Sequence, residues 1–430
     1  MSSSHPELSF ERSFAQQQDA SDALARFRSA FRIPPRSDGA RGAYLCGHSL
    51  GLQPRAAADI LAEELDSWAQ RAVDGHFDSA RPWMSYHEAL APSLARLVGA
   101  EPGEVAAMNT LTVNLHLMLA SFYRPTRERH RILIEKRAFS SDRYAVASQI
   151  RHHGFDPRES LMEIGPRAGE DLIRTDDVCE CIEREARSIA TVMLPGVQYL
   201  TGQQFEIARI AEVARRHDCA VGFDLAHSIG NTPVQLHDAN VDFAVWCSYK
   251  YLNGGPGAIG GCFVHERHAH AYDLPRLAGW WGHDKASRFA MPQEFRPIPG
   301  AEGWRISNLP ILSTAPLLAS LRLFDEAGLP ALRAKSVRLT RYLEALLEAR
   351  VKDALTIVTP RDPDARGCQL SLRLHRARDQ ARAVFDALCR RGFVGDWREP
   401  DVIRVAPIPL YNTFVDVWEF VAALHEELAA

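Results

Sequence analysis

The feature that most constrains this chain is a carboxylate and a lysine that each follow an apolar run. The first run, Val221-Gly-Phe, ends in Asp224, and a second run from residue 241 to 247 leads through Ser248 and Tyr249 to Lys250. Short apolar runs of this kind predict buried strands. Ionisable groups at the strand ends of α/β folds collect where ligands bind, so we expect the two side chains in one site.

A buried amine and a buried carboxylate are the two groups that pyridoxal 5'-phosphate (PLP) needs. The lysine holds the aldehyde of the cofactor as a Schiff base, and the carboxylate keeps the pyridine nitrogen protonated so that the ring can accept electrons. The alternative is a turn-capping aspartate and a solvated lysine. The glycine-rich segment 251–257, which follows Lys250 and leads into another apolar run, argues against that alternative. The sequence therefore predicts PLP as the cofactor.

The overall composition is that of an ordinary globular protein. The 430 residues are 46% hydrophobic and 24% charged, and the formal net charge of −4 gives no basic field for nucleic acid or an anionic membrane. The sequence has no apolar run long enough for a membrane span and no signal-peptide pattern. Eight scattered cysteines favour reduced thiols in the cytoplasm. The pair Cys179 and Cys181 lacks a second pair, so we predict no metal site.

Strand-like runs and helical periodicity alternate through the middle of the chain. Buried strands are expected at residues 131–135, 189–194, 219–224, 241–247 and 258–264. A helix at residues 205–217 is expected to cross over the sheet. This alternation predicts an α/β fold whose sheet is mostly parallel and doubly wound.

The pattern changes after about residue 314. Amphipathic helices are expected at 314–327 and 331–349, then a strand at 369–374, a helix at 380–391, a strand at 402–406 and a helix from 415. We therefore expect a small C-terminal α+β domain of residues 314–430 and a large PLP-binding domain of residues 76–313. The N-terminal segment, residues 1–75, is expected to pack with the small domain.

Several phrases of the sequence resemble the kynureninase family, which belongs to the fold-type I PLP enzymes of the aminotransferase class V group. The phrases are Gly47-His-Ser-Leu-Gly-Leu-Gln-Pro54, Arg81-Pro-Trp83, Thr201-Gly-Gln203, Trp246-Cys-Ser-Tyr-Lys-Tyr-Leu-Asn253, His265-Glu-Arg-His-Ala-His270, Gly279-Trp-Trp-Gly-His283, Arg305-Ile-Ser-Asn308 and Val402-Ile-Arg-Val-Ala-Pro407. The resemblance implies a seven-stranded type of sheet. It also implies hydrolysis of kynurenine or 3-hydroxykynurenine at the Cβ–Cγ bond, which gives an anthranilate and alanine.

Carried over by position, the resemblance implies roles at the cofactor. Lys250 is the Schiff-base lysine and the base that removes the Cα proton, and Asp224 pairs with the pyridine nitrogen. Tyr249, beside the lysine, contacts the cofactor phosphate and relays protons. The remaining cofactor contacts that the resemblance implies are Leu111, Thr112, Phe139, Asp142, His227, Trp280 and Asn308. Structural alternatives remain open for several of them: a helix N-cap for Thr112, and core side chains for Phe139, Tyr249 and His227.

The resemblance also implies substrate contacts. Arg404 is the candidate for the substrate α-carboxylate, since a guanidinium fork binds a carboxylate bidentately; a structural ion pair is the alternative. His76, Ser307 and Asn308 resemble the aryl pocket of relatives that favour 3-hydroxykynurenine. Trp280 and Asn308 resemble residues that a second subunit supplies, so we expect a homodimer with shared active sites. The histidines at 265, 268 and 270 are interpreted as part of a surface helix without metal.

Two positions depart from the family pattern, and two other functions stay open. His48 stands where Asn is expected, and Pro195 stands where some relatives have a hydroxyl residue near the phosphate.

A cysteine desulfurase of the same fold is the nearest alternative, with Cys368 as its thiol, but the sequence after Cys368 leads directly into a strand. A non-catalytic PLP-binding regulatory protein is the other alternative. It is disfavoured because the base, the ring acceptor and the carboxylate clamp are all present.

Overall fold

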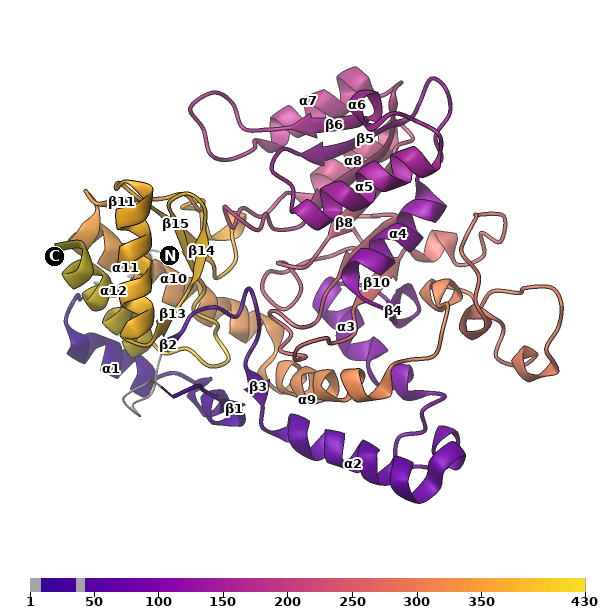
Figure 1. Ribbon diagram of the computed structural model, residues 1–430, viewed down its shortest axis with the longest axis horizontal. Helices are drawn as coiled ribbons and strands as arrows, with labels where there is room; N and C mark the ends of the chain where they lie inside the picture. Colours follow the sequence, from indigo (N-terminus) through magenta and orange to yellow (C-terminus); the bar gives the residue numbers. More distant parts are fainter. Residues whose placement is uncertain (1–8, 36–42, 430) are drawn as a thin grey trace, which may run out of the picture.

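The computed structural model describes residues 9–35 and 43–429, and its larger part is built on a seven-stranded sheet (Figure 1). The strands are β4 (Val105–Ala107), β5 (Arg131–Glu135), β6 (Leu161–Ile164), β7 (Ile189–Pro195), β8 (Ala220–Asp224), β9 (Phe243–Trp246) and β10 (Gly261–Val264). Their order is β4-β10-β9-β8-β7-β5-β6. The five neighbouring strands β9, β8, β7, β5 and β6 run parallel to one another. Strand β10 runs antiparallel to both of its neighbours, β9 and β4. The predicted α/β fold with a mostly parallel sheet is confirmed.

The strands send alternate side chains into two cores on opposite faces of this sheet. On β9, Ala244 and Trp246 belong to one core, while Phe243 and Val245 belong to the other. The first core includes helices α3 (Ala91–Val98), α7 (Thr175–Glu185) and α8 (Ile207–Arg216); the second includes α4 (Leu111–Phe122) and α5 (Ser140–His152). Because both faces of the sheet are covered, the central strands are continuous apolar runs. This pattern is the reason that the sequence predicts them. Strands β4 and β6 are not predicted, since neither exceeds four residues.

A four-stranded antiparallel sheet forms the small domain at the other end of the molecule (Figure 1). Its strands, in spatial order, are β11 (Leu355–Ile357), β12 (Leu370–Leu374), β15 (Val402–Val405) and β14 (Asp396–Arg398). Helices α10 (Leu329–Val351), α11 (Arg378–Arg390) and α12 (Phe414–Ala429) pack with this sheet in a third core. The predicted strands at 369–374 and 402–406 correspond to β12 and β15.

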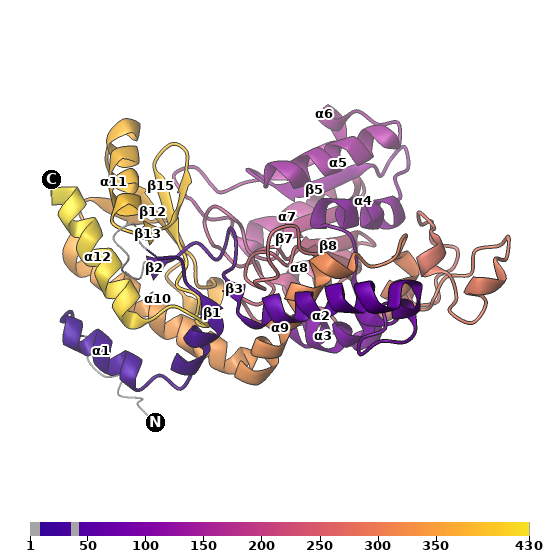
Figure 2. The same cartoon turned by 60° about the horizontal axis from the view of Figure 1, so that its bottom comes forward.

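The N-terminal segment contacts both domains. Helix α1 (Arg12–Ala20) packs against α12, and β2 (Ala43–Tyr44) pairs in parallel with β13 (Phe393–Val394) of the small domain. Helix α2 (Ala56–Arg71) instead lies along α9 (Ile311–Ala327), as Figure 2 shows. The remaining elements are β1 (Phe31–Arg32), which pairs with β3 (Gln53–Pro54), and the short helix α6 (Pro157–Ser160). The domain limits at residues 75 and 313 remain predictions.

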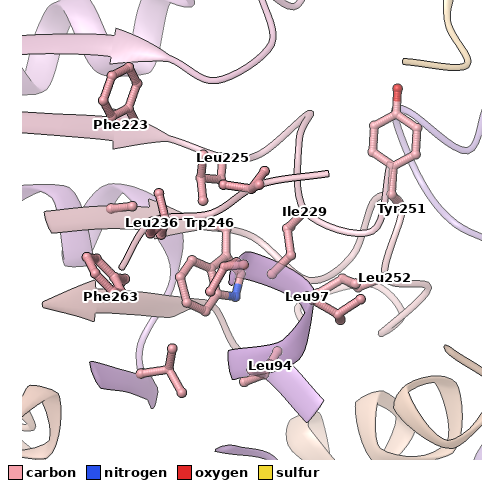
Figure 3. Packing of buried hydrophobic residues seen from close by; sticks show 14 of the residues in the cluster. Leu94, Leu97, Phe223, Leu225, Ile229, Leu236, Trp246, Tyr251, Leu252 and Phe263 are labelled. Carbon is pink, nitrogen blue, oxygen red and sulfur yellow. The ribbon is translucent and has the colours of Figure 1, made fainter. Parts of the chain in front are cut away.

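The turn that carries Lys250 is held by buried packing on both sides. Trp246, the last residue of β9, lies fully buried in the same cluster as Tyr251 and Leu252, which directly follow the lysine (Figure 3). From the other side, the N–H of Gly51 donates a hydrogen bond of 2.8 Å to the carbonyl of Tyr249. A Cβ at Gly51 would lie 2.4 Å from the carbonyl oxygen of Lys250, so only glycine fits there. The backbone of the lysine is therefore fixed by the fold.

No helix among the described residues is both long enough and apolar enough to cross a membrane.

Candidate active site

Lys250 lines a cavity of about 150 Å³ at the carboxyl ends of three parallel strands. The last residues of β5, β7 and β8, which are Glu135, Pro195 and Asp224, line the same cavity. The Nζ atom of Lys250 lies 3.0 Å from Nε2 of His227. Burial and the neighbouring lysine hold the pKa of His227 well below its usual range, so the uncharged imidazole accepts a hydrogen bond from the lysine.

Three carboxyl groups share this cavity with the lysine. One oxygen of Asp224 accepts a hydrogen bond of 2.7 Å from the N–H of Ala226. Asp142, in the first turn of α5, has a buried Oδ1 without a hydrogen-bond partner among the described residues. Burial and the neighbouring Asp224 raise the pKa of Asp142 well above its usual range, and burial raises the pKa of Glu135 to about 8. Such a group of acids suits a ligand that brings a positively charged N–H donor.

The start of α4 also lines the cavity. Leu111 and Thr112 are the first two residues of this helix and follow its N-cap, Thr110. N–H groups in a first helical turn have no partner within the helix and favour a phosphate. The hydroxyl of Thr112 lies 2.7 Å from that of Ser141, and both residues line the cavity. Thr112 is therefore not the N-cap, which was its structural alternative.

Aromatic side chains form one wall of the cavity. The ring centroid of Phe139 lies 5.4 Å from that of Tyr199, with the two rings nearly perpendicular. The Nζ atom of Lys250 lies 5.8 Å from the ring centroid of Phe139 and 5.9 Å from that of Tyr249. Burial raises the pKa of Tyr249, so its phenol stays protonated. A flat heteroaromatic ring held by the lysine would lie against Phe139.

Arg404 lies on β15 of the small domain, and its side chain is almost fully buried. It donates one hydrogen bond of 2.6 Å to the carbonyl of Tyr199 and one of 2.5 Å to Asp396. Its Nε has no partner among the described residues. The guanidinium therefore reaches the aromatic wall of the cavity while it is paired with a carboxylate of its own domain.

The predicted aryl-pocket residues and the two residues predicted to come from a second subunit, Trp280 and Asn308, gather in a different pocket. His76, Trp280, Ser307 and Asn308 line a pocket of about 440 Å³, and none of them lines the cavity of Lys250. Two aromatic side chains of this pocket, Phe77 and Phe289, are 62% and 57% exposed. One chain therefore carries two separate sets of candidate site residues.

Of the two departures from the family pattern, Pro195 lines the cavity and His48 lies near Asp396. Pro195 ends β7 and lines the cavity, where it offers no hydroxyl group. His48 is fully buried, and neither of its ring nitrogens has a hydrogen-bond partner among the described residues. Its Nε2 lies 3.9 Å from Asp396, and burial together with Arg404 holds its pKa well below the usual range.

The sequence interpretation missed Glu135, Ser141, Tyr199 and Asp396. Glu135 ends a predicted strand, just as Asp224 does, so its position could have marked it as a cavity residue. The turn at Glu399 and Pro400 between two short β runs was the signal that could have placed Asp396 opposite Arg404. No local signal identifies Tyr199, because it lies in a loop.

The histidines at 265, 268 and 270 make separate contacts within the chain. His265 accepts a hydrogen bond from the N–H of Arg267, and His268 lies 2.8 Å from Asp242. His270 lies 3.0 Å from the hydroxyl of Tyr272. His265, Glu104 and His237 lie close enough together to hold a metal ion. Their ring nitrogens and carboxylate oxygens are already engaged in hydrogen bonds with one another and with the backbone.

The cavity residues fit PLP. The unpartnered oxygen of Asp142 and the neighbouring carboxylate of Asp224 would hold a protonated pyridine nitrogen, and the first turn of α4 would hold the phosphate. Lys250 and Phe139 complete the set with an amine and an aromatic wall. Lys335 offers a contrast, because its side chain is buried and its Nζ lies 2.6 Å from Asp22 in an ion pair.

Comparisons with known proteins agree with this geometry. The model of the kynureninase C-terminal domain matches residues 332–424. Kynureninase of Myxococcus xanthus strain DK1622 is 56% identical over 412 residues, which is 96% of either chain, and that of Xanthomonas campestris pv. campestris strain B100 is 56% identical over 97% of this chain and 98% of its own. This chain belongs to the kynureninase family.

Solved structures with the same fold are more distant. The cysteine desulfurase CsdA of Escherichia coli matches with a TM-score of 0.76 at 18% identity, over 94% of this chain and 98% of its own. A C-DES mutant with glycine covalently linked to its PLP cofactor matches with a TM-score of 0.75 at 16% identity, over 90% of this chain and 96% of its own. At such identities the likeness establishes the fold alone.

We predict that Lys250 is the residue that binds the cofactor covalently. The purified protein should be yellow, and borohydride should reduce the linkage and attach the label to the peptide that contains Lys250. Absorbance spectroscopy and peptide mapping provide the measurement. Lys250→Ala should lose the label, whereas Lys335 should stay unlabelled because Asp22 already holds it. Label on any other lysine would contradict the assignment.

We predict a pH dependence of stability from Glu135. Its pKa in the folded protein, about 8, lies above the usual value near 4.5, so the folded state binds this proton more tightly. The resulting stability is present below about pH 4.5 and is lost as the pH rises through about 8. In urea unfolding at alkaline pH, Glu135→Gln should therefore have a higher free energy of unfolding than the wild type. Exposed Glu294→Gln is the control, and parallel pH curves for wild type and Glu135→Gln would refute the assignment.

Proposed function

We propose that this chain catalyses the PLP-dependent hydrolysis of L-kynurenine, 3-hydroxy-L-kynurenine or both at the Cβ–Cγ bond. The products are anthranilate or 3-hydroxyanthranilate and L-alanine, a step of tryptophan catabolism towards NAD precursors. One observation carries the proposal: a chain 56% identical to kynureninases over nearly its full length has Lys250, His227 and Asp224 together in one cavity. We place the enzyme in the cytoplasm, which its eight free cysteines support.

The cofactor supplies an electron sink that makes proton loss at the substrate Cα accessible. The amine of Lys250 is the group that takes this proton, and uncharged His227 at 3.0 Å can share it through a hydrogen bond. Asp224, whose carboxylate accepts a hydrogen bond from the N–H of Ala226, would hold the proton of the cofactor's ring nitrogen. Tyr249, whose phenol remains protonated, is the proposed donor of a hydrogen bond on the phosphate side.

Arg404 is the proposed clamp for the substrate α-carboxylate. Its guanidinium contacts Tyr199, which lines the cavity, and its Nε–H has no partner among the described residues. A planar fork on one side of the cofactor would fix which bond at Cα lies across the ring. Substrate binding would then depend on a residue of the small domain, while proton transfer depends on the large domain.

We propose that a homodimer completes the site. The second pocket, with His76, Trp280, Ser307 and Asn308, supplies the aryl-binding residues to the Lys250 cavity of the partner subunit. Its mixture of exposed aromatic side chains and polar groups suits an aryl ketone with an added hydroxyl. A hydrogen bond to that hydroxyl is worth on the order of 1 kcal/mol, so 3-hydroxykynurenine is the proposed preferred substrate by at most about tenfold.

The desulfurase alternative is not favoured. Its thiol would be Cys368, which is 1% exposed and whose N–H is held by the side chain of Asn231. Burial raises the pKa of this thiol to about 12, the opposite of what a nucleophilic cysteine requires. A non-catalytic PLP-binding protein is not favoured either, because the chain has all three groups that the reaction needs: the amine of Lys250, the carboxylate of Asp224 and the guanidinium of Arg404.

The assay that tests the function measures kcat/KM for both kynurenines, with cysteine run in parallel. We expect an anthranilate product and alanine from both, a preference for the 3-hydroxy substrate, and no sulfide from cysteine. Lys250→Ala should lower turnover by orders of magnitude, because it removes the cofactor linkage and the base together. Sulfide release without an anthranilate would establish the desulfurase instead.

The shared site predicts complementation between two inactive variants. A dimer of Lys250→Ala with the double variant His76→Ala/Asn308→Ala keeps one complete site, so mixed and reassembled subunits should regain about a quarter of wild-type activity for a statistical mixture. The matched control is Lys250→Ala mixed with Asp224→Ala, two changes within one cavity, which should regain none. Equal recovery in both mixtures, or full activity of a demonstrated monomer, would refute the shared site.

A further inference from the structure

Asp396 holds the guanidinium of Arg404 in place. Its Oδ2 accepts hydrogen bonds of 2.5 Å from Arg404 and 2.5 Å from the hydroxyl of Ser49. Its Oδ1 lies 2.9 Å from Nε of Arg398. Burial alone would raise the pKa of Asp396, but the charge of Arg404 and the hydrogen bonds from Ser49 and Arg404 lower it to about 2. The carboxylate is therefore ionised throughout the physiological range.

The fold fixes this pair through strand register. Strands β14 and β15 are antiparallel neighbours, and Asp396 is the register partner of Arg404. Directly opposed residues of such a ladder have Cβ atoms close enough for their side chains to pair. The second anchor of the guanidinium, the carbonyl of Tyr199, comes from the large domain, so two elements far apart in sequence define the plane of the fork.

The charges around Asp396 do not cancel. Two guanidinium groups, Arg398 and Arg404, share this one carboxylate. In addition, Nε of Arg404 and both ring nitrogens of His48 are buried without a hydrogen-bond partner among the described residues. Buried polar atoms normally have partners, and an unpaired buried donor is costly. One further carboxylate beside Arg404 would balance the charge and satisfy a donor.

We propose that Asp396 is a positioning residue for the substrate α-carboxylate: it holds the guanidinium of Arg404 beside Tyr199, a residue that lines the cavity. This inference rests on the proposed clamp role of Arg404 and deepens it. Asp396 does not itself contact the substrate. Without it, the guanidinium keeps the Tyr199 carbonyl and a longer contact of 3.4 Å to the hydroxyl of Ser49, but no charged partner. It can then rotate away, so amino acid ligands lose affinity while the cofactor and the base stay unchanged.

The test compares Asp396→Ala and Asp396→Asn with the wild-type holoenzyme. Alanine removes every acceptor, and asparagine keeps one acceptor oxygen but no charge. We expect KM for kynurenine to rise by about tenfold or more in Asp396→Ala and by less in Asp396→Asn, with kcat and the cofactor absorbance nearly unchanged. Asp401→Asn, in the turn of the same hairpin, is the control and should leave KM unchanged.

A second readout separates positioning from a general structural role. Decarboxylated kynurenine, which lacks the α-carboxylate, should inhibit the wild type and both Asp396 variants with the same inhibition constant. An equal loss of affinity for this amine, an unchanged KM, or a KM that falls would each overturn the proposal. A loss of cofactor absorbance in Asp396→Asn would overturn it as well, because the role would then be structural.

L-Alanine makes the outcome independent of the proposed reaction. Titrated against the cofactor absorbance, it should bind the wild-type holoenzyme and bind more weakly to Asp396→Ala, to Asp396→Asn and to Arg404→Lys. If neither kynurenine is hydrolysed but the alanine affinities fall in this way, the proposed function fails while the positioning role stands. If kynurenine is hydrolysed and the Asp396 variants bind alanine as the wild type does, the positioning role fails alone.

Discussion

The site depends on the convergence of parallel strands at one edge of the large sheet. Because β5, β7 and β8 run in the same direction, their last residues, Glu135, Pro195 and Asp224, end at the same cavity. The chain after β9 then brings Lys250 to this edge, and buried Trp246 and Tyr251 anchor it there. An antiparallel arrangement would have sent alternate strand ends to opposite edges, and the amine and the acid would not have met.

Burial then decides which groups of the cavity carry charge. Burial raises the pKa of Asp142 and the pKa of Glu135, and the charge of the neighbouring Asp224 raises both further, so the cavity does not ionise all of its acids. His227 has the reverse shift and stays neutral, so it can accept a hydrogen bond from Lys250 without competing as a second cation. The same burial that makes the polar groups costly thus assigns them different protonation states in one small volume.

The sequence predicted the parts of the fold and the site that have a local signal. Strands buried on both faces are continuous apolar runs, and Asp224 and Lys250 stand at their ends, so both could be placed before the structure was known. Strands β4 and β6 escaped because a run of three or four residues has no clear period. Tyr199 escaped because its contact with Arg404 joins segments that are 205 residues apart in the chain. Asp396 escaped because its strand, β14, has only three residues and shows no clear period. The resemblance to kynureninases was needed for Phe139, His76 and Arg404, whose residue types alone fit structural roles equally well.

The position of Arg404 links recognition to the arrangement of the two domains. Its guanidinium belongs to the small domain, but one anchor, Tyr199, belongs to the large domain, and Ser49 of the N-terminal segment joins it through Asp396. A shift of the small domain that broke the contact with Tyr199 would move the guanidinium away from the aromatic wall while leaving its pair with Asp396 intact, because that pair lies within one sheet. The proposed recognition of an α-carboxylate by Arg404 therefore depends on both domains: the pair with Asp396 sets the guanidinium within the small domain, and the contact with Tyr199 sets it beside the aromatic wall of the large domain.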